Sequence, residues 1–175
     1  MGGLVEARSC SFVPAPWGWV GLAATAVGLS AVVLGADRAL LRRELLQRSP
    51  AARDEVNPVL AAAAAQLAEY FSGQLRHFDL PCDLAGLSPF SGRVLGALRQ
   101  IPYATTVSYG ELALVAGHPG AARAIGGVMA RNPLPLILPC HRVVAKSGAL
   151  TGYSGGEGVV TKAWLLAFEA QQAQK

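Results

Sequence analysis

A cysteine, a histidine and an arginine are adjacent at Cys140, His141 and Arg142, directly after a short, proline-interrupted apolar run. A thiol attacks as its thiolate, so a working cysteine needs a base or a positive charge close by. In a regular strand, neighbouring side chains point to opposite faces, which would separate Cys140 from His141. Pro139 indicates that a strand breaks here, and a turn or one bridging water would couple the two side chains. The segment is therefore a candidate nucleophilic site. The alternative is that Cys140 is only a small buried apolar residue and Arg142 a surface charge.

Two short helices are predicted just before this segment. Ser108 and Glu111 form a capping-box pattern, which predicts a helix over residues 109–116. A Gly-His-Pro-Gly turn follows, and a second helix is expected over residues 121–131, ending at an Asn-Pro pair. Helix, short glycine-containing turn and helix is the DNA-binding helix-turn-helix pattern, and an ordinary helical hairpin is the alternative.

The second of these helices is expected to have a thin surface. Alanine and glycine dominate it, and Arg123 is the only long side chain near its start. Gly126 and Gly127 each cost roughly 1 kcal/mol relative to alanine in a helix interior, so we expect a close approach to compensate. A thin helix suits a narrow groove and makes few contacts to base edges, as expected of a protein indifferent to DNA sequence.

Basic residues are concentrated around the cysteine. Residues 84–156 carry six arginines and lysines against Glu111 alone, a net charge of +5. Residues 1–83 carry seven basic and eight acidic side chains, a net charge of −1. A positive field at this position favours a polyanionic partner, and a solvated basic face is the alternative.

The run from Pro139 to Val143, preceded by Asn132-Pro133 and followed by Gly-Tyr-Ser-Gly-Gly at 152–156, resembles the signature of the O6-alkylguanine-DNA alkyltransferases. The resemblance extends over about residues 88–169. It implies a DNA repair protein that binds duplex DNA through the minor groove without sequence preference and flips out O6-alkylguanine. The alkyl group would pass irreversibly to Cys140, making this a single-turnover, suicide methyltransferase. We expect a cytoplasmic monomer without cofactor, metal or membrane partner.

The resemblance also implies roles for individual residues. Glu169 would orient His141, which would draw the proton of Cys140 through a water molecule, and Asn132 would brace the loop before the thiol. Arg123 would take the place of the extruded nucleotide, and Tyr109 would assist rotation at the adjacent phosphate. The expected DNA-binding residues are Tyr109, Ala122, Arg123, Ala124 and Gly126. The flipped base would lie beside Cys140, among Tyr109, Met129, Pro135, Val143, Tyr153 and Ser154.

Three rival functions share part of this pattern. A relative that binds alkylated guanine without transfer lacks the nucleophile of the Pro-x-His-Arg motif, whereas Cys140 is present here. A cysteine hydrolase using Cys140 and His141 needs oxyanion donors and would turn over repeatedly. A transcription factor with a structural cysteine would prefer particular DNA sequences.

The N-terminal half predicts a small scaffold of strands and helices. No charged residue occurs from Ser9 to Ala36, which raises a membrane-spanning segment as a hypothesis. Prolines and glycines divide the run, so two strands over 17–22 and 29–34 are expected instead. Helices are expected over 38–47 and 59–71, the second following an Asn-Pro start.

Two further helices are expected in the C-terminal half. The first covers residues 91–100, and the second covers residues 160–172 with Glu169 beside its apolar stripe. That stripe is expected to bury Trp164, Leu165 and Phe168. The predicted fold class is therefore α/β in the α+β sense. A sheet-plus-helices domain over 1–80 and a linker over 81–89 precede a mainly helical domain over 90–175.

The chain contains three cysteines, Cys10, Cys82 and Cys140. This odd, sparse set is unlike a secreted disulfide framework and fits a reducing cytoplasm. No metal-ligand spacing is present, so a zinc site has little support from the residues. Some members of the resembling family hold a structural zinc in the N-terminal domain, for which Cys10, Cys82 and His77 are the candidate ligands.

Overall fold

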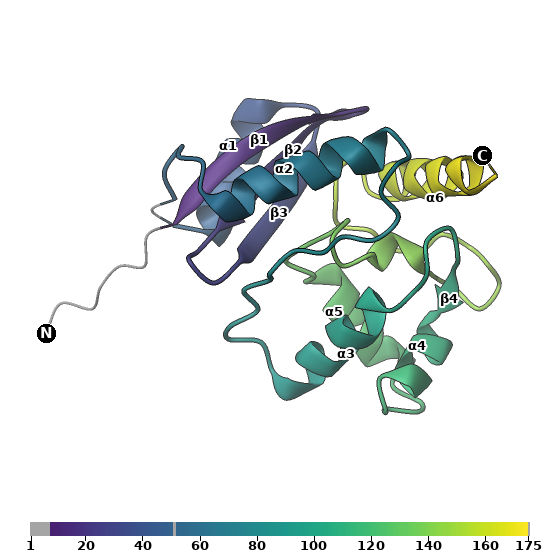
Figure 1. Ribbon diagram of the computed structural model, residues 1–175. Coiled ribbons are helices and arrows are strands. Elements are labelled where there is room, and N and C mark those ends of the chain that lie inside the picture. Colours follow the sequence, from purple (N-terminus) through teal and green to yellow (C-terminus); the bar gives the residue numbers. More distant parts are fainter. Residues whose placement is uncertain (1–7, 51, 175) are drawn as a thin grey trace, which may run out of the picture. The chain divides into compact units, whose positions relative to one another are not determined.

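The computed structural model describes residues 8–50 and 52–174, and the chain divides into two compact units between Asp83 and Leu84 (Figure 1). The first unit contains an antiparallel sheet of three strands in the order β1-β2-β3 and two helices. Its elements are β1 (Ser9–Ala15), β2 (Gly18–Ala24), β3 (Leu29–Gly35), α1 (Arg38–Arg48) and α2 (Pro58–Phe71). Helix α2 begins as expected, because the Asn57 side chain caps it by accepting from the Leu60 amide at 2.9 Å.

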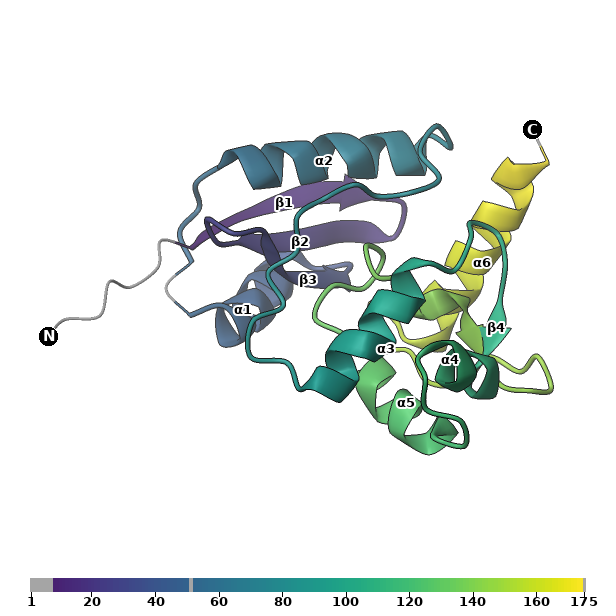
Figure 2. The ribbon, with the colours of Figure 1, turned by 60° about the horizontal axis from the view of Figure 1, so that its bottom comes forward.

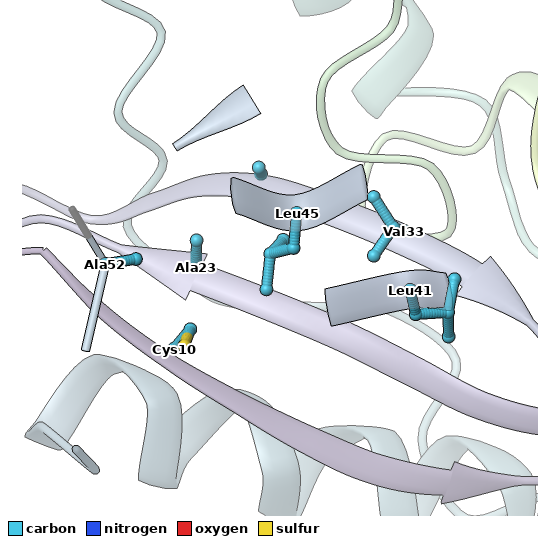
Figure 3. Close-up of a cluster of buried hydrophobic side chains, with 7 residues drawn as sticks. Cys10, Ala23, Val33, Leu41, Leu45 and Ala52 are labelled. Atoms are coloured by element: carbon cyan, nitrogen blue, oxygen red, sulfur yellow. The ribbon is translucent and has the colours of Figure 1, made fainter. Parts of the chain in front are cut away.

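The uncharged run of the N-terminal half forms the strands of this sheet. Helices cover both faces of the sheet, which explains why these strands carry no charged residue (Figure 2). Leu41 and Leu45 of α1 pack on one face against Cys10, Ala23 and Val33 (Figure 3). Strand residues that alternate with these are buried on the other face, where Figure 2 shows α2. Strands that are covered on both faces consist of consecutive apolar residues, because side chains on both faces are buried. No helix in the described ranges is long and apolar enough to cross a membrane.

Strand β1 was not predicted from the sequence. It pairs with β2 through the register Ala15–Gly18 to Ser9–Ala24 and lies at the edge of the sheet. Pro14 obscured it, because proline lacks the amide hydrogen of an inner strand and is tolerated only at an edge. The tight turn that follows requires Gly18, whose φ is +133° and where a side chain would meet the backbone of Ala36.

The second unit is mainly helical, so the predicted fold class is confirmed. Its elements are α3 (Pro89–Arg99), β4 (Val107–Ser108), α4 (Tyr109–Val115), α5 (Ala122–Ala130), a 3-10 turn η1 (Cys140–Arg142), β5 (Val143–Val144) and α6 (Val159–Ala173). Helix α3 begins two residues earlier than expected. The Ser88 hydroxyl caps it, and Pro89 occupies a position in the first turn where its missing amide hydrogen costs nothing.

Helix α4 starts beside the segment that carries the cysteine. The capping box is present: the Ser108 hydroxyl accepts from the Glu111 amide at 3.2 Å, and the Glu111 carboxylate accepts from the Ser108 amide at 2.6 Å. Just before the helix, Val107 pairs in parallel with Val143, so β4 and β5 bring the start of α4 next to the turn η1. This two-residue pairing had no sequence signal.

The buried face of α6 differs from the expected one. Leu165 is buried, but Trp164 is 36% exposed and stacks on the half-buried Phe168, with ring centroids 5.0 Å apart. The expected burial of Trp164 is therefore wrong. The inward face of the helix instead contains Leu165 together with three polar side chains, Thr161, Lys162 and Glu169.

Candidate active site

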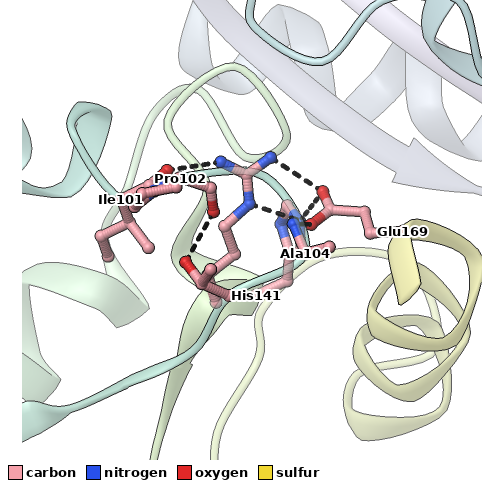
Figure 4. A network of polar contacts seen from close by, with 7 residues as sticks. Ile101, Pro102, Ala104, His141 and Glu169 are labelled. Carbon is pink, nitrogen blue, oxygen red and sulfur yellow. Dashed lines mark hydrogen bonds and ion pairs between the residues drawn. The ribbon is translucent and has the colours of Figure 1, made fainter. Parts of the chain in front are cut away.

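Glu169 is fully buried and accepts hydrogen bonds from two other parts of the chain (Figure 4). Its carboxylate lies 2.8 Å from Nε2 of His141 and accepts from the Ala104 amide at 3.0 Å. Arg142 binds it with Nε at 3.0 Å and Nη2 at 2.9 Å, while its Nη1 donates to the Ile101 carbonyl at 2.7 Å. The carboxylate thus joins α6, the turn η1 and the segment after α3.

These contacts set the protonation of the carboxylate and the imidazole. Burial alone would raise the pKa of Glu169, but His141 and Arg142 lower it to about 2, so the group is a carboxylate at neutral pH. Burial lowers the pKa of His141 below its usual 6.5, outweighing the attraction of Glu169, so the imidazole is neutral. Because a carboxylate only accepts, Nε2 carries the proton. The buried Nδ1 atom has no hydrogen-bond partner within the described part of the chain.

Cys140 begins the turn η1 and is only 4% exposed. The turn replaces a strand, as expected from Pro139, and keeps the thiol and the imidazole on one short piece of backbone. Burial raises the pKa of the Cys140 thiol to about 11, against the lowering effects of Asn132, Lys162 and two backbone amides. The thiol is therefore protonated at neutral pH and needs a base, and the lone pair on Nδ1 of His141 is a suitable acceptor.

Asn132 links the end of α5 to the cysteine turn. Its Nδ2 donates to the Leu138 carbonyl at 2.8 Å, and its Oδ1 accepts from the Leu134 amide at 3.0 Å. It also donates a hydrogen bond that favours the thiolate form of Cys140. The apolar run after Asn132 is an irregular buried loop, including Leu136 at a φ of +75°, so its backbone depends on this side chain.

A pocket of about 230 Å³ brings together five of the predicted residues: Tyr109, Gly126, Met129, Tyr153 and Ser154, with Ala130 and Gly152 completing the lining. Its volume lies below the roughly 300–1,000 Å³ of sites for drug-sized ligands, which suits a single planar base. Pro135 and Val143 are buried but do not line it. Tyr109 is fixed at the edge, because its hydroxyl donates to the Thr151 carbonyl at 3.1 Å.

The outer face of α5 carries the residues expected to meet DNA. Arg123 and Ala124 are exposed, and Ala122 and Gly126 are half-buried. Gly126 opens onto the pocket, and a methyl group there would meet nothing within 4 Å. At Gly127 a methyl group would make only an ordinary contact, because the guanidinium of Arg131 lies 3.4 Å from the position that it would take. Within the described residues, the close approach expected for these two glycines is therefore not made by the chain itself.

Two cations of the site have positions that the sequence did not predict. Arg142 follows the thiol directly in the sequence, but its guanidinium is buried and binds Glu169, so it is not the surface arginine of the alternative interpretation. Lys162 was not singled out, and its side chain is fully buried. A signal was available for Lys162: positions 162, 165 and 169 share one face of a helix, so a lysine there joins Leu165 and Glu169 on the buried side.

The candidate zinc ligands do not form a cluster. Among residues 8–50 and 52–174, no group of three or more histidine, cysteine or acidic side chains could hold a metal ion. The Cys10 thiol donates to Asp54 at 3.2 Å, and the Cys82 thiol donates to the Leu80 carbonyl at 3.4 Å.

Comparison with known proteins agrees with this geometry. The profile of the family described as "6-O-methylguanine DNA methyltransferase, DNA binding domain" matches residues 89–171. The chain is 49% identical over 118 residues to a methylated-DNA–protein-cysteine methyltransferase of Mycolicibacterium paratuberculosis, covering 67% of this chain and 70% of that protein. It is 46% identical to the constitutive Bacillus subtilis protein of that name, with 64% and 67% covered. A crystal structure of Mycobacterium tuberculosis OGT in complex with DNA aligns with a TM-score of 0.78 and 36% identity, over 95% and 94% of the two chains.

The protonation of the Cys140–His141 pair predicts a pH profile. Between the lowered pKa of His141 and the pKa of about 11 of Cys140, the pair holds the same number of protons at every pH. Alkylation of Cys140 by a neutral reagent such as iodoacetamide should therefore be nearly constant from about pH 7 to 9 and fall only at a pH below the usual pKa of histidine, where the imidazole becomes protonated. Mass spectrometry of the peptide holding Cys140 measures this rate. A rise of about tenfold per pH unit across that range would mean that free thiolate reacts without the imidazole.

Proposed function

Because this chain belongs to the family of methylated-DNA–protein-cysteine methyltransferases, we propose that it repairs O6-alkylguanine in duplex DNA by taking the alkyl group onto its own Cys140. One observation carries the proposal for this residue. The buried thiol of Cys140 shares a turn with a neutral His141, whose ring is held by Glu169 and whose Nδ1 atom is without a partner within the described part of the chain. We further propose that the protein acts in the cytoplasm as a monomer.

The proton and the alkyl group move in opposite directions. The thiol proton of Cys140 passes through a bridging water to Nδ1 of His141, and the resulting imidazolium is stabilised by Glu169. The thiolate attacks the saturated carbon on O6, so a C–S bond forms as the C–O bond breaks. The guanine leaves with the electron pair and regains one proton. The product is a thioether, which water does not cleave, so each chain acts once.

The pocket receives the base only after it leaves the duplex, since an exocyclic oxygen inside stacked DNA is out of reach. We propose that α5 enters the minor groove, with its small residues against the DNA and Arg123 in the space that the nucleotide vacates. Tyr109 stands at the pocket edge, where it would guide rotation at the adjacent phosphate. Few base-edge contacts are possible from such a surface, which fits a search for damage rather than for a sequence.

The rival functions have less support. A lesion-binding relative without transfer would lack the nucleophile, and here Cys140 is present with a base. A cysteine hydrolase needs backbone amides free to bind an oxyanion. The amide of Cys140 instead donates to the Leu138 carbonyl at 2.8 Å, and the amide of His141 lowers the pKa of the Cys140 thiol. A transcription factor would need side chains that read base edges, and α5 presents mainly alanine and glycine.

We expect Cys140 to be the sole acceptor. Incubation with excess DNA containing O6-methylguanine should add one methyl group per chain, on the peptide holding Cys140, and then stop. Cys10, whose pKa is raised to about 11 by burial and by Asp54, should remain unmodified. Intact mass and peptide mapping measure both, and Cys140→Ala should still bind DNA. Turnover beyond one equivalent, or methyl on Cys10 or Cys82, would contradict the proposal.

Arg123→Ala should separate base extrusion from chemistry. We expect repair of duplex DNA to slow by about 10–100-fold, the effect of losing roughly 1.4–2.7 kcal/mol of stabilisation of the opened duplex. Reaction with free O6-benzylguanine should be unchanged, because no duplex has to open. The matched control is Arg43→Ala, which removes one exposed arginine from α1. Equal losses on both substrates would count against the role of Arg123 in extrusion.

A further inference from the structure

Lys162 is a buried lysine that the mechanism above does not use. Its side chain is fully buried in the first half of α6. Its ammonium donates to three carbonyl oxygens: Val143 at 2.6 Å, Thr151 at 3.0 Å and Gly152 at 3.5 Å. Within the described residues no carboxylate forms an ion pair with it. A buried charge without a counter-charge is unfavourable, so its retention here calls for a reason.

The carbonyls that Lys162 binds connect the thiol to the base pocket. Val143 lies three residues after Cys140, at the start of β5. The Thr151 carbonyl also accepts from the Tyr109 hydroxyl, and Gly152 lines the pocket. One ammonium group therefore fixes the segment that follows the nucleophile and the wall where the alkylated base would rest.

The charge of Lys162 also acts on Cys140. Burial lowers the pKa of Lys162, and attraction to Cys140 is the opposing effect that raises it. Glu169, seven residues along the same helix, is already bound by Arg142 and His141. The counter-charge that remains for Lys162 is thus the thiolate of Cys140, which exists only while the alkyl group is being transferred.

Other groups around Cys140 do not supply this charge. His141, in the same turn, is neutral at rest, and Asn132 contributes an uncharged amide. Tyr153 faces Cys140 from the loop before α6, and burial raises the pKa of its phenol, so it is also neutral. Arg142 and Glu169 bind each other, leaving Lys162 as the cation that lowers the pKa of Cys140.

We propose that Lys162 is a positioning residue for alkyl transfer, whose buried ammonium stabilises the Cys140 thiolate as it forms and fixes the Val143 and Thr151 carbonyls beside the base pocket. The proposal deepens the assignment of Cys140 as acceptor and rests on it. It predicts that the rate of attack by Cys140 depends on the positive charge at position 162, in addition to the hydrogen bonds made there.

The test compares three replacements at this position by two reactions. Lys162→Arg keeps the charge, Lys162→Gln keeps a donor without charge, and Lys162→Met removes both. Lys146→Met is the control, because it removes an exposed lysine from the same unit. Iodoacetamide reports on the thiolate of Cys140 without requiring the base pocket, and free O6-benzylguanine requires both. Circular dichroism confirms that each variant is folded, and Lys162→Gln carries the test if Lys162→Met does not fold.

We expect Lys162→Met and Lys162→Gln to react with iodoacetamide about tenfold more slowly than the parent protein at neutral pH, the effect of about one pKa unit at the thiol. Lys162→Arg should stay within about threefold of the parent, and Lys146→Met should be unchanged. The reaction with O6-benzylguanine should fall further in the two uncharged variants, because the pocket wall is also released.

Different results separate the possibilities. If the uncharged variants react with iodoacetamide at the parental rate or faster, Lys162 only braces the loops and the charge role is overturned. A Lys162→Gln variant that behaves like the parent leads to the same conclusion. If the parent reacts with iodoacetamide at Cys140 but transfers nothing from O6-benzylguanine or alkylated DNA, the proposed function fails, while the coupling between Lys162 and Cys140 stands.

Discussion

The second unit depends on one buried carboxylate. Glu169 accepts from His141, Arg142 and the amide of Ala104, which belong to segments far apart in the sequence. Loss of one partner from a buried ion pair typically costs about 3–5 kcal/mol, because the other charge is left uncompensated. The interaction that aims the imidazole is therefore also one that holds the fold, so the catalytic geometry and the stability of this unit share the same atoms.

The charged groups around Cys140 are paired so that the nucleophile is an unreactive, neutral thiol before alkyl transfer. Arg142 neutralises Glu169, so the carboxylate orients His141 without forcing a second proton onto it. Burial keeps the Cys140 thiol protonated at rest, which limits reaction with unrelated electrophiles. The positive charge of Lys162 is not paired with an acid in the described residues, so it is available to the thiolate that forms during transfer. Alkyl transfer thus starts from a neutral thiol and a neutral base.

Local signals were readable from the sequence, and long-range partners were not. The capping residues Ser108 and Asn57 define helix starts by bonds within a few residues, so those helices were predicted. The same holds for the break at Pro139. The direction of Arg142 depends on Glu169, 27 residues away, and its adjacency to the thiol gave no indication of this partner. Trp164 was expected to be buried because it is large and apolar. The buried face of α6 instead carries Lys162 and Glu169, because it packs against a polar site.

The central claim is that His141 is a neutral base with its free lone pair on Nδ1, held by a carboxylate that Arg142 has already neutralised. Nitrogen-15 NMR of the imidazole in the unreacted protein at neutral pH tests this most directly, because the two ring nitrogens have different shifts when protonated and when bare. The account predicts a protonated Nε2 and a bare Nδ1. Two protonated nitrogens, or a proton on Nδ1 alone, would contradict it, since neither form could take the proton of Cys140.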